Sequence, residues 1–363
     1  MMSLALILKE HREKYGLTQL QLAETLHVDE RTLRRWEHQE TRLTDVRELR
    51  RLASVLGVAA ERLGVTDQAG GISPEQADET LHHVWQLIAA ARFFEARAVA
   101  ERLVAELQTN APCPGCQAHL YRLTQAHRVT AYVRSENTRT SEVRYPLASY
   151  RAMEQTARLL DDPPLLALAL AFEGEMYTRV GEVNTGNEYL ETALGIAPDE
   201  DSPAKGAVAL LLAKGYFKAG QRGAYERWMA EAEARAEQVT GDSVIGEPFG
   251  LKAVYAEYGR SSALLGNLHQ ALEYIERAQH LPPFGTYWDL VLKTTTVMAL
   301  IRGGEIQCGV ALAVECIELC RKHGAFRLLE RIYRMQQYLQ CLTTSLEQST
   351  ALLREALDGP IEY

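Results

Sequence analysis

A pattern of helix, glycine and helix recurs four times in the second half of the chain. The copies read FEGEMYTRVGEVNTGNEYLETALGIAP, LAKGYFKAGQRGAYERWMAEAEARA, YGRSSALLGNLHQALEYIERAQHLP and TVMALIRGGEIQCGVALAVECIEL, and they align on Gly181, Gly220, Gly266 and Gly304. Alanine and leucine stand at helical spacing around each glycine, with almost none of the alternation that marks a strand. The repetition predicts an all-α array of stacked helix pairs.

Small residues keep fixed distances from these glycines. Those seven positions before a glycine are Gly174, Ala213 and Gly259, and those twelve positions after are Ala193, Ala232 and Ala278. Small side chains at matched positions allow the two helices of a pair to pack closely.

These features resemble tetratricopeptide repeats, and Pro198 and Pro282 match the proline that ends such a repeat. The resemblance is good from residue 164 to residue 283. The glycine spacings of 39, 46 and 38 residues exceed the usual period of about 34, so we expect an irregular superhelix. Further helix pairs are expected near residues 75–108 and 113–161, and after Phe326.

Stacked pairs of this kind curve into a solenoid with a concave groove. The resemblance implies that the first helix of each pair lines that groove. The polar residues that it nominates as ligand contacts are Glu175, Lys214, Arg260 and Lys293. The alternative is that these residues are solvated polar positions with no ligand.

The N-terminal segment differs from the rest of the chain in charge. Residues 1–64 hold 11 basic and 10 acidic residues, a net charge of +1, whereas the whole chain carries −9. Three of the arginines fall within VDERTLRRWE, residues 28–37. A basic helix in an acidic protein favours a negatively charged partner for that helix.

Cap signals divide residues 4–63 into five expected helices. The first stops at Gly16, and the second begins at Thr18, whose capping box is completed by Gln21. Asp29 can cap a third helix, which buries Leu33 and Trp36 and leaves its arginines in water. Two short helices joined by a tight turn, the second one basic, favour insertion of that helix into a DNA major groove.

The segments LTQLQLAETLHVDERTLRRWE and LRRLASVLGV resemble the helix-turn-helix family of lambda-Cro-type and xenobiotic-response-element-type repressors. The resemblance covers residues 4–64 and implies a lambda-repressor-like DNA-binding domain. It assigns DNA contacts to Gln19, Asp29, Glu30, Arg31, Arg34 and Arg35, of which Arg34 is expected at phosphate. It also pairs Arg12 with Glu37 as a structural ion pair.

Arginine suits base recognition because its guanidinium can donate two hydrogen bonds to guanine, and Glu30 could accept from cytosine. The alternative for all three arginines is a solvated helix face. Because one nearly neutral domain binds DNA weakly, the resemblance further implies a homodimer on a roughly palindromic site, with recognition helices roughly 34 Å apart.

A boundary is expected at VTDQAGGISPEQ, where paired glycines favour a turn and Ser73 can cap a new helix starting at Pro74. We therefore expect a helix-turn-helix domain over residues 1–65, a linker over 66–74 and the repeat domain over 75–363. The combination resembles the peptide-pheromone-responsive quorum-sensing regulators. This resemblance implies a transcriptional regulator whose groove binds a short signalling peptide.

Two other functions stay open. NAPCPGCQAHLYRLTQAH places Cys113 and Cys116 near His119 and His127, which could hold zinc or cycle as a thiol pair. The protein could also be an interaction adaptor whose first domain docks protein. No enzyme is expected, since the sequence lacks a Gly-rich phosphate loop, a His-Glu-x-x-His motif and a Gly-x-Ser-x-Gly elbow, and no cofactor is expected either.

The apolar run LALIL at residues 4–8 is too short for a signal peptide, and no stretch approaches the roughly 20 apolar residues of a membrane span. Six cysteines without regular spacing suit a reducing compartment. The sequence therefore predicts a cytoplasmic protein with no membrane partner.

Overall fold

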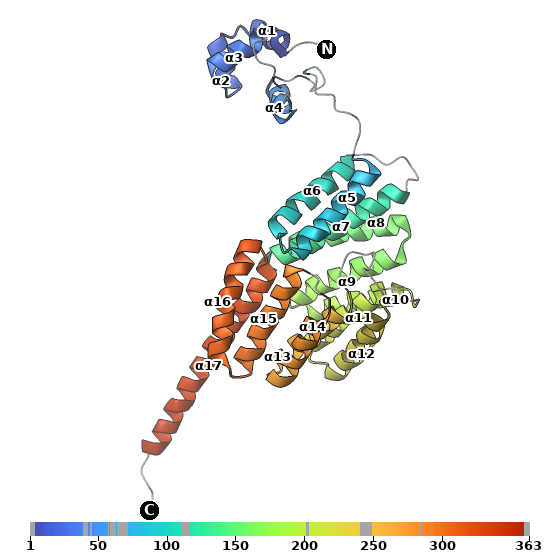
Figure 1. Cartoon of the computed structure of the whole chain (residues 1–363), viewed down its shortest axis with the longest axis vertical. Coiled ribbons are helices and arrows are strands. Elements are labelled where there is room, and N and C mark those ends of the chain that lie inside the picture. The colour runs from blue at the N-terminus through green and yellow to red at the C-terminus, as the bar shows by residue number, and fades with distance from the viewer. Residues whose placement is uncertain are drawn as a thin grey trace, which may run out of the picture. The chain divides into compact units, whose positions relative to one another are not determined.

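The computed structural model describes residues 4–38, 43, 46–56, 58, 63, 72–109, 117–200, 203–239, 249–282 and 285–358. The chain divides into two compact units, Met1–Gly71 and Ile72–Tyr363, with the division inside the predicted linker. Over the described ranges every regular element is a helix (Figure 1), so the all-α prediction is confirmed.

The first unit contains four described helices, namely α1 (Leu4–Tyr15), α2 (Gln19–Thr25), α3 (Glu30–Glu37) and α4 (Val46–Leu56). The predicted caps are present: Thr18 and Gln21 form the capping box of α2, and Asp29 caps α3. The chain leaves α1 through Gly16 at φ +63°, a left-handed conformation that glycine adopts without steric cost. The predicted fifth helix falls outside the described residues.

Apolar faces of these helices form one small core. Its fully buried members include Leu8, Leu22, Leu26, Leu33 and Leu52. Burial of this face holds α3 with its arginine-bearing side outward.

The second unit is a stack of helix pairs followed by a single helix. The pairs are α5 (Pro74–Ala89) with α6 (Phe93–Thr109), α7 (Gln117–Asn137) with α8 (Arg144–Leu160), α9 (Pro163–Val180) with α10 (Val183–Ile196), α11 (Pro203–Lys218) with α12 (Arg222–Gln238), α13 (Leu251–Leu264) with α14 (Leu268–His280), and α15 (Thr286–Arg302) with α16 (Ile306–His323). A short 3-10 turn, η2 (Thr140–Glu142), joins α7 to α8. The predicted helix pair after Phe326 is wrong, because α17 (Phe326–Asp358) is one continuous helix.

The aligned glycines and small residues have the roles that their spacing predicts. All four glycines adopt positive φ at the turns, for example +100° at Gly181. A side chain at Gly174 would come within 2.7 Å of the Gly186 carbonyl oxygen, so α9 and α10 pack backbone to backbone. Ala193, Ala232 and Ala278 are fully buried.

The solenoid closes on itself, because its first helices meet its last ones. The Asn137 side-chain amide donates a hydrogen bond of 2.8 Å to the carbonyl oxygen of Gly324, and Phe93 packs edge to face against Tyr287 with ring centroids 5.2 Å apart. One apolar cluster accordingly combines residues of α5, α6 and α7 with residues of α15, α16 and α17. The concave face thus becomes an interior.

Candidate DNA-contact helix and interior ligand cavity

The N-terminus of α3 is held by Asp29. Its carboxylate accepts one hydrogen bond of 2.8 Å from the backbone N–H of Thr32 and another of 2.7 Å from the Thr32 hydroxyl. These bonds lower the pKa of Asp29. The carboxylate is therefore engaged in capping, which the sequence predicts, and its predicted contact with a base stays a prediction.

The three arginines of α3 are exposed but differ in their partners. Arg34 donates a hydrogen bond of 2.9 Å to Glu30, one helical turn earlier. Neither Arg31 nor Arg35 forms an ion pair with a described residue. Arg31 and Arg35 therefore differ from Arg34, whose guanidinium is held by Glu30.

Glu37 joins the first three helices. It is 2% exposed, and its carboxylate accepts hydrogen bonds from Arg12 at 3.2 Å and from Gln19 at 2.6 Å. The predicted ion pair of Arg12 with Glu37 is present. Gln19 is bonded to this buried carboxylate, which fixes α2 against α3 and orients α3, and its predicted contact with DNA stays a prediction.

The interior of the solenoid holds two adjoining cavities with volumes of about 130 and 120 Å³. They are lined mainly by the first helices of the pairs and by α17, as the resemblance implies. Glu175, Lys214 and Arg260 line both cavities. Lys293 does not join them, because it is exposed on α15 and lines neither cavity.

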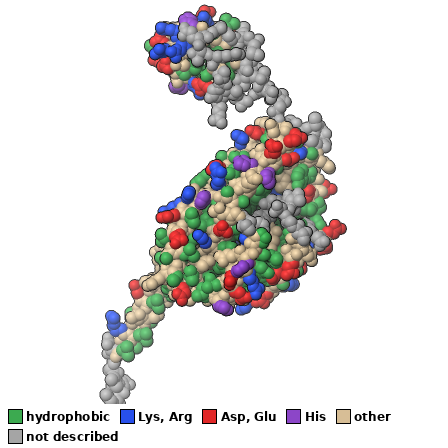
Figure 2. Space-filling view, in the orientation of Figure 1, with side chains coloured by type: hydrophobic (Ala, Val, Ile, Leu, Met, Phe, Trp, Pro, Cys, Tyr) green, Lys and Arg blue, Asp and Glu red, His purple; other side chains and the backbone are tan. Residues whose placement is uncertain are grey.

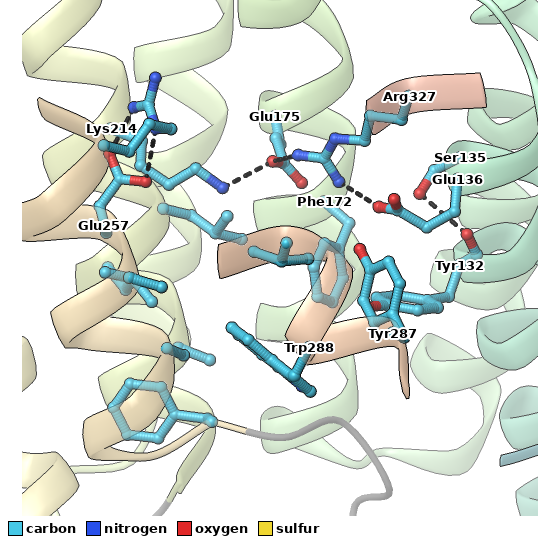
Figure 3. A pocket seen from close by; sticks show the side chains of 18 of the residues that line it. Tyr132, Ser135, Glu136, Phe172, Glu175, Lys214, Glu257, Tyr287, Trp288 and Arg327 are labelled. Atoms are coloured by element: carbon cyan, nitrogen blue, oxygen red, sulfur yellow. Dashed lines mark hydrogen bonds and ion pairs between the residues drawn. The ribbon is translucent and has the colours of Figure 1, made fainter. Parts of the chain in front are cut away.

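A cluster of charges lines the first cavity (Figure 3), and three of its members, Glu175, Lys214 and Arg327, also line the second. The Arg327 guanidinium lies 2.5 Å from a carboxylate oxygen of Glu136 and 2.6 Å from one of Glu175. Lys214 donates to the same Glu175 oxygen at 2.8 Å. These cations hold the pKa of Glu175 well below its usual range despite its burial.

The sequence analysis does not single out Glu136 or Arg327. Both lie outside the stretch of clear repeats, and they meet only because the solenoid closes, since 191 positions separate them. A signal was nevertheless available: an arginine at the start of the last helix, among apolar residues, needs a buried carboxylate as partner.

The first cavity is otherwise largely aromatic and aliphatic. Apart from charged residues and Ser135, its lining consists of Tyr132, Tyr150, Phe172, Ala207, Leu210, Leu211, Phe249, Ala253, Ala256, Tyr287, Trp288 and Val291. The second cavity is basic, with Arg179, Lys218 and Arg334 on its walls. Burial beside Arg260 lowers the pKa of Lys218 to about 7, although Glu175 opposes the effect.

The metal or redox alternative gains no structural support. Cys113 and Cys116 fall outside the described residues, and the described residues contain no group of three metal-ligand side chains. His127 is buried in α7, and burial, reinforced by Arg134, lowers its pKa to about 4.

Comparison with known proteins assigns the first unit. Residues 8–63 match the helix-turn-helix family of DNA-binding domains. The chain therefore joins a helix-turn-helix domain of the xenobiotic-response-element type to a solenoid of tetratricopeptide-like repeats. No curated protein matches the chain in sequence.

Among solved structures, a Rap protein complexed with competence and sporulation factor matches 97% of this chain and 97% of its own, with a TM-score of 0.56 at 12% identity. The chain thus shares the helical-repeat fold of that protein. Bacillus thuringiensis PlcR, solved with the peptide PapR7 and DNA, matches 76% of this chain and 92% of its own at 16% identity and a TM-score of 0.39. BtubC from P. vanneervenii matches 68% and 92% at 19% identity and a TM-score of 0.42.

In the part of the chain that the structure describes, no helix combines the length and apolar character that crossing a bilayer requires.

Proposed function

We propose that the protein is a transcriptional regulator that binds a specific DNA duplex through α3 and a short peptide inside its solenoid. The observation that carries the proposal is the interior site, where three residues nominated from the repeat pattern line two adjoining cavities beside the Arg327 cluster. The Rap protein that shares the repeat fold was solved in complex with competence and sporulation factor, which supports a ligand-binding role for this fold.

For DNA, the proposal assigns base contacts to Arg31 and Arg35, which are exposed on the helix-turn-helix domain. Glu30 and Arg34 pair with each other. We propose that Glu30 contacts the edge of a base and that Arg34 contacts a phosphate. Asp29 and Gln19 hold the helix through their bonds to Thr32 and Glu37, and the proposal gives them further contacts with DNA.

We further propose a homodimer, formed by the C-terminal half of α17. Leu328, Ile332 and Met335 pack into the solenoid, and the same stripe continues at three- and four-residue steps through Leu339, Leu342 and Leu346. Leu346 and Leu353 are 59% and 66% exposed. Figure 2 shows the green apolar side chains along this projecting segment.

An apolar stripe with this spacing is the pattern that two packed helices bury between them. The charged residues of the segment 340–357 are Glu347, Arg354 and Glu355, and their helical positions place them away from the stripe. A second copy of α17 can therefore pair with the first without bringing like charges together. Pairing would supply two recognition helices for one palindromic site.

Two experiments test the proposal. Selection from a random duplex pool should enrich one roughly palindromic sequence; if binding shows no sequence preference, the regulator assignment is wrong. Native mass spectrometry of the protein isolated from its own cells should show a dimer that retains a peptide-sized mass, which fragmentation would then sequence. Retained zinc would instead favour the Cys113 and Cys116 alternative.

A further inference from the structure

Arg331 occupies an unusual position between the two interior cavities. It lies on α17 one turn after Arg327 and lines both cavities. Arg327 has two carboxylate partners, but Arg331 forms no hydrogen bond or ion pair with any residue that the structure describes. A guanidinium offers five N–H donors, so all five donors of Arg331 can bind a ligand in the cavities.

The surroundings of Arg331 are short of negative charge. Burial and the adjacent cations Arg327 and Arg260 lower the pKa of Arg331 to about 10, with only partial relief from Tyr287 and Glu136. An anion placed here would relieve that repulsion.

The count of lining charges agrees. The basic residues on the walls of the two cavities are Arg179, Lys214, Lys218, Arg260, Arg327, Arg331 and Arg334, whereas the acidic ones are Glu136, Glu175, Glu257 and Glu330. Each of these four carboxylates already accepts hydrogen bonds from within the protein. The interior therefore carries a positive excess in a chain whose net charge is −9.

The apolar wall of the first cavity adds a second requirement. Phe172, Leu211 and Trp288 line the first cavity together with the charge cluster. A ligand that fills the site needs an apolar part beside its charged part, because burying polar groups against these side chains without partners is costly.

We propose that Arg331 receives a carboxylate of the bound ligand, so that the solenoid selects peptides with an acidic group next to an apolar residue. The inference rests on the proposed function, since it names the ligand class for the same interior. Arginine is the residue suited to this task, because its planar fork binds a carboxylate through two parallel hydrogen bonds. The carboxylate belongs either to an aspartate or glutamate side chain or to the peptide C-terminus.

The test uses four pools of pentapeptides that share randomised apolar positions. The pools carry either Asp or Asn at one fixed position and either a free or an amidated C-terminus. The full-length protein is incubated with each pool, and native mass spectrometry measures the peptides that it retains. We expect retention of at least one carboxylate-bearing pool to exceed that of the amidated Asn pool by about ten-fold. The Asp-amide and Asn-acid pools distinguish the side-chain carboxylate from the terminal one.

Variants link the effect to the residue. Arg331→Gln should abolish the ten-fold preference, Arg331→Lys should restore part of it, and Arg354→Gln, on the same helix outside the cavities, should leave it unchanged. Circular dichroism melting checks that each variant is folded. If Arg331→Gln does not fold, Arg331→Lys takes its place in the comparison, and its preference for the carboxylate-bearing pool should be smaller than that of the wild-type protein.

The outcomes separate the two proposals. If the wild-type protein retains all four pools equally, or if Arg331→Gln keeps the preference, the carboxylate site is refuted while peptide binding stands. If the wild-type protein retains no pool, both this inference and the peptide-binding part of the proposed function are overturned.

Discussion

Arg327 and Glu175, which are 152 positions apart in the sequence, are joined by an ion pair of 2.6 Å inside the solenoid. The same guanidinium binds Glu136, whose side chain is fully buried. One arginine of the last helix thus neutralises carboxylates on α7 and α9. The arrangement places a buried charge network at the centre of the proposed ligand site.

Removing Arg327 should destabilise the fold strongly. Arg327→Met leaves Glu136 and Glu175 with less positive charge in a buried site, which we expect to lower the free energy of unfolding by about 3–5 kcal/mol. Chemical denaturation monitored by circular dichroism measures the loss, and Arg354→Met on the exposed part of α17 is the control. A loss below about 1 kcal/mol would show that water or other cations satisfy the two carboxylates.

Arg31 and Arg35 should account for most of the sequence specificity on DNA. Because a bidentate contact to a base is worth about 1–3 kcal/mol, the double variant Arg31→Ala, Arg35→Ala should weaken binding to the selected duplex by about thirty-fold or more. Arg34→Ala should have a smaller effect, since that guanidinium is tied to Glu30. Fluorescence anisotropy with specific and scrambled duplexes tests this, and equal losses in the double variant and in Arg34→Ala would contradict the assignment.

Lys214 and Lys293 form a matched pair for testing the ligand site. Lys214→Glu reverses a charge that lines both cavities, so we expect it to abolish any effect of the retained ligand on DNA binding. Lys293→Glu makes the same change at an exposed position of α15 and should have no effect. Both variants should bind DNA normally without ligand. Gel-shift titrations with and without the retained ligand measure the response, and the assignment fails if Lys214→Glu still responds.

Glu173 should make stability depend on pH. It is 1% exposed, and burial together with the nearby Glu154 raises its pKa to about 8 from an ordinary value of 4.5, although Arg151, which lies 3.8 Å away and is half exposed, opposes the shift. Between these two values the folded protein holds a proton that the unfolded chain releases, so stability falls as pH rises through this range. Glu173→Gln should flatten that decline.

Thermal melting from pH 4.5 to 8 checks the effect of Glu173, and Glu188→Gln, an exposed change on α10, should keep the wild-type pH dependence. Identical slopes for Glu173→Gln and the wild-type protein would mean that Glu173 stays ionised when buried.

The stripe on α17 should control oligomeric state. Leu346→Glu with Leu353→Glu places charges on the surface proposed to pair, so we expect light scattering to report a monomer and specific DNA affinity to fall. Gln348→Glu adds a charge on another side of the same helix and should leave the dimer intact. A double variant that remains dimeric would place the interface elsewhere.

Local chemistry made much of the fold predictable. Helix caps and glycine turns depend on a few adjacent residues. The structure has the capping boxes at Thr18 and Ser73, the cap at Asp29 and the glycine turns. The single helix after Phe326 was also readable, because residues 326–358 contain neither glycine nor proline. The repeat pattern predicted another helix pair here, but the absence of a helix-breaking residue favours one continuous helix, which is what the structure has.

The interior site was less predictable, because its partners come from distant parts of the chain. The repeat pattern located Glu175, Lys214 and Arg260, which share a position on successive first helices. Lys293 does not share that position, because it lies eleven residues before Gly304 and not six, and the residue at the shared position of α15 is Met298, which lines the second cavity. The repeat pattern could not reveal Glu136 or Arg327, because their meeting depends on how far the superhelix turns before it closes.

That closure changes how the repeats depend on one another. In an open array each repeat touches only its neighbours, and the terminal ones can fray while the middle holds. Here the contact of Asn137 with Gly324 and of Phe93 with Tyr287 gives the last repeats a second set of neighbours. The last repeats therefore cannot unfold without breaking their contacts with the first ones. A change in one repeat can reach another along the chain in either direction around the closed solenoid.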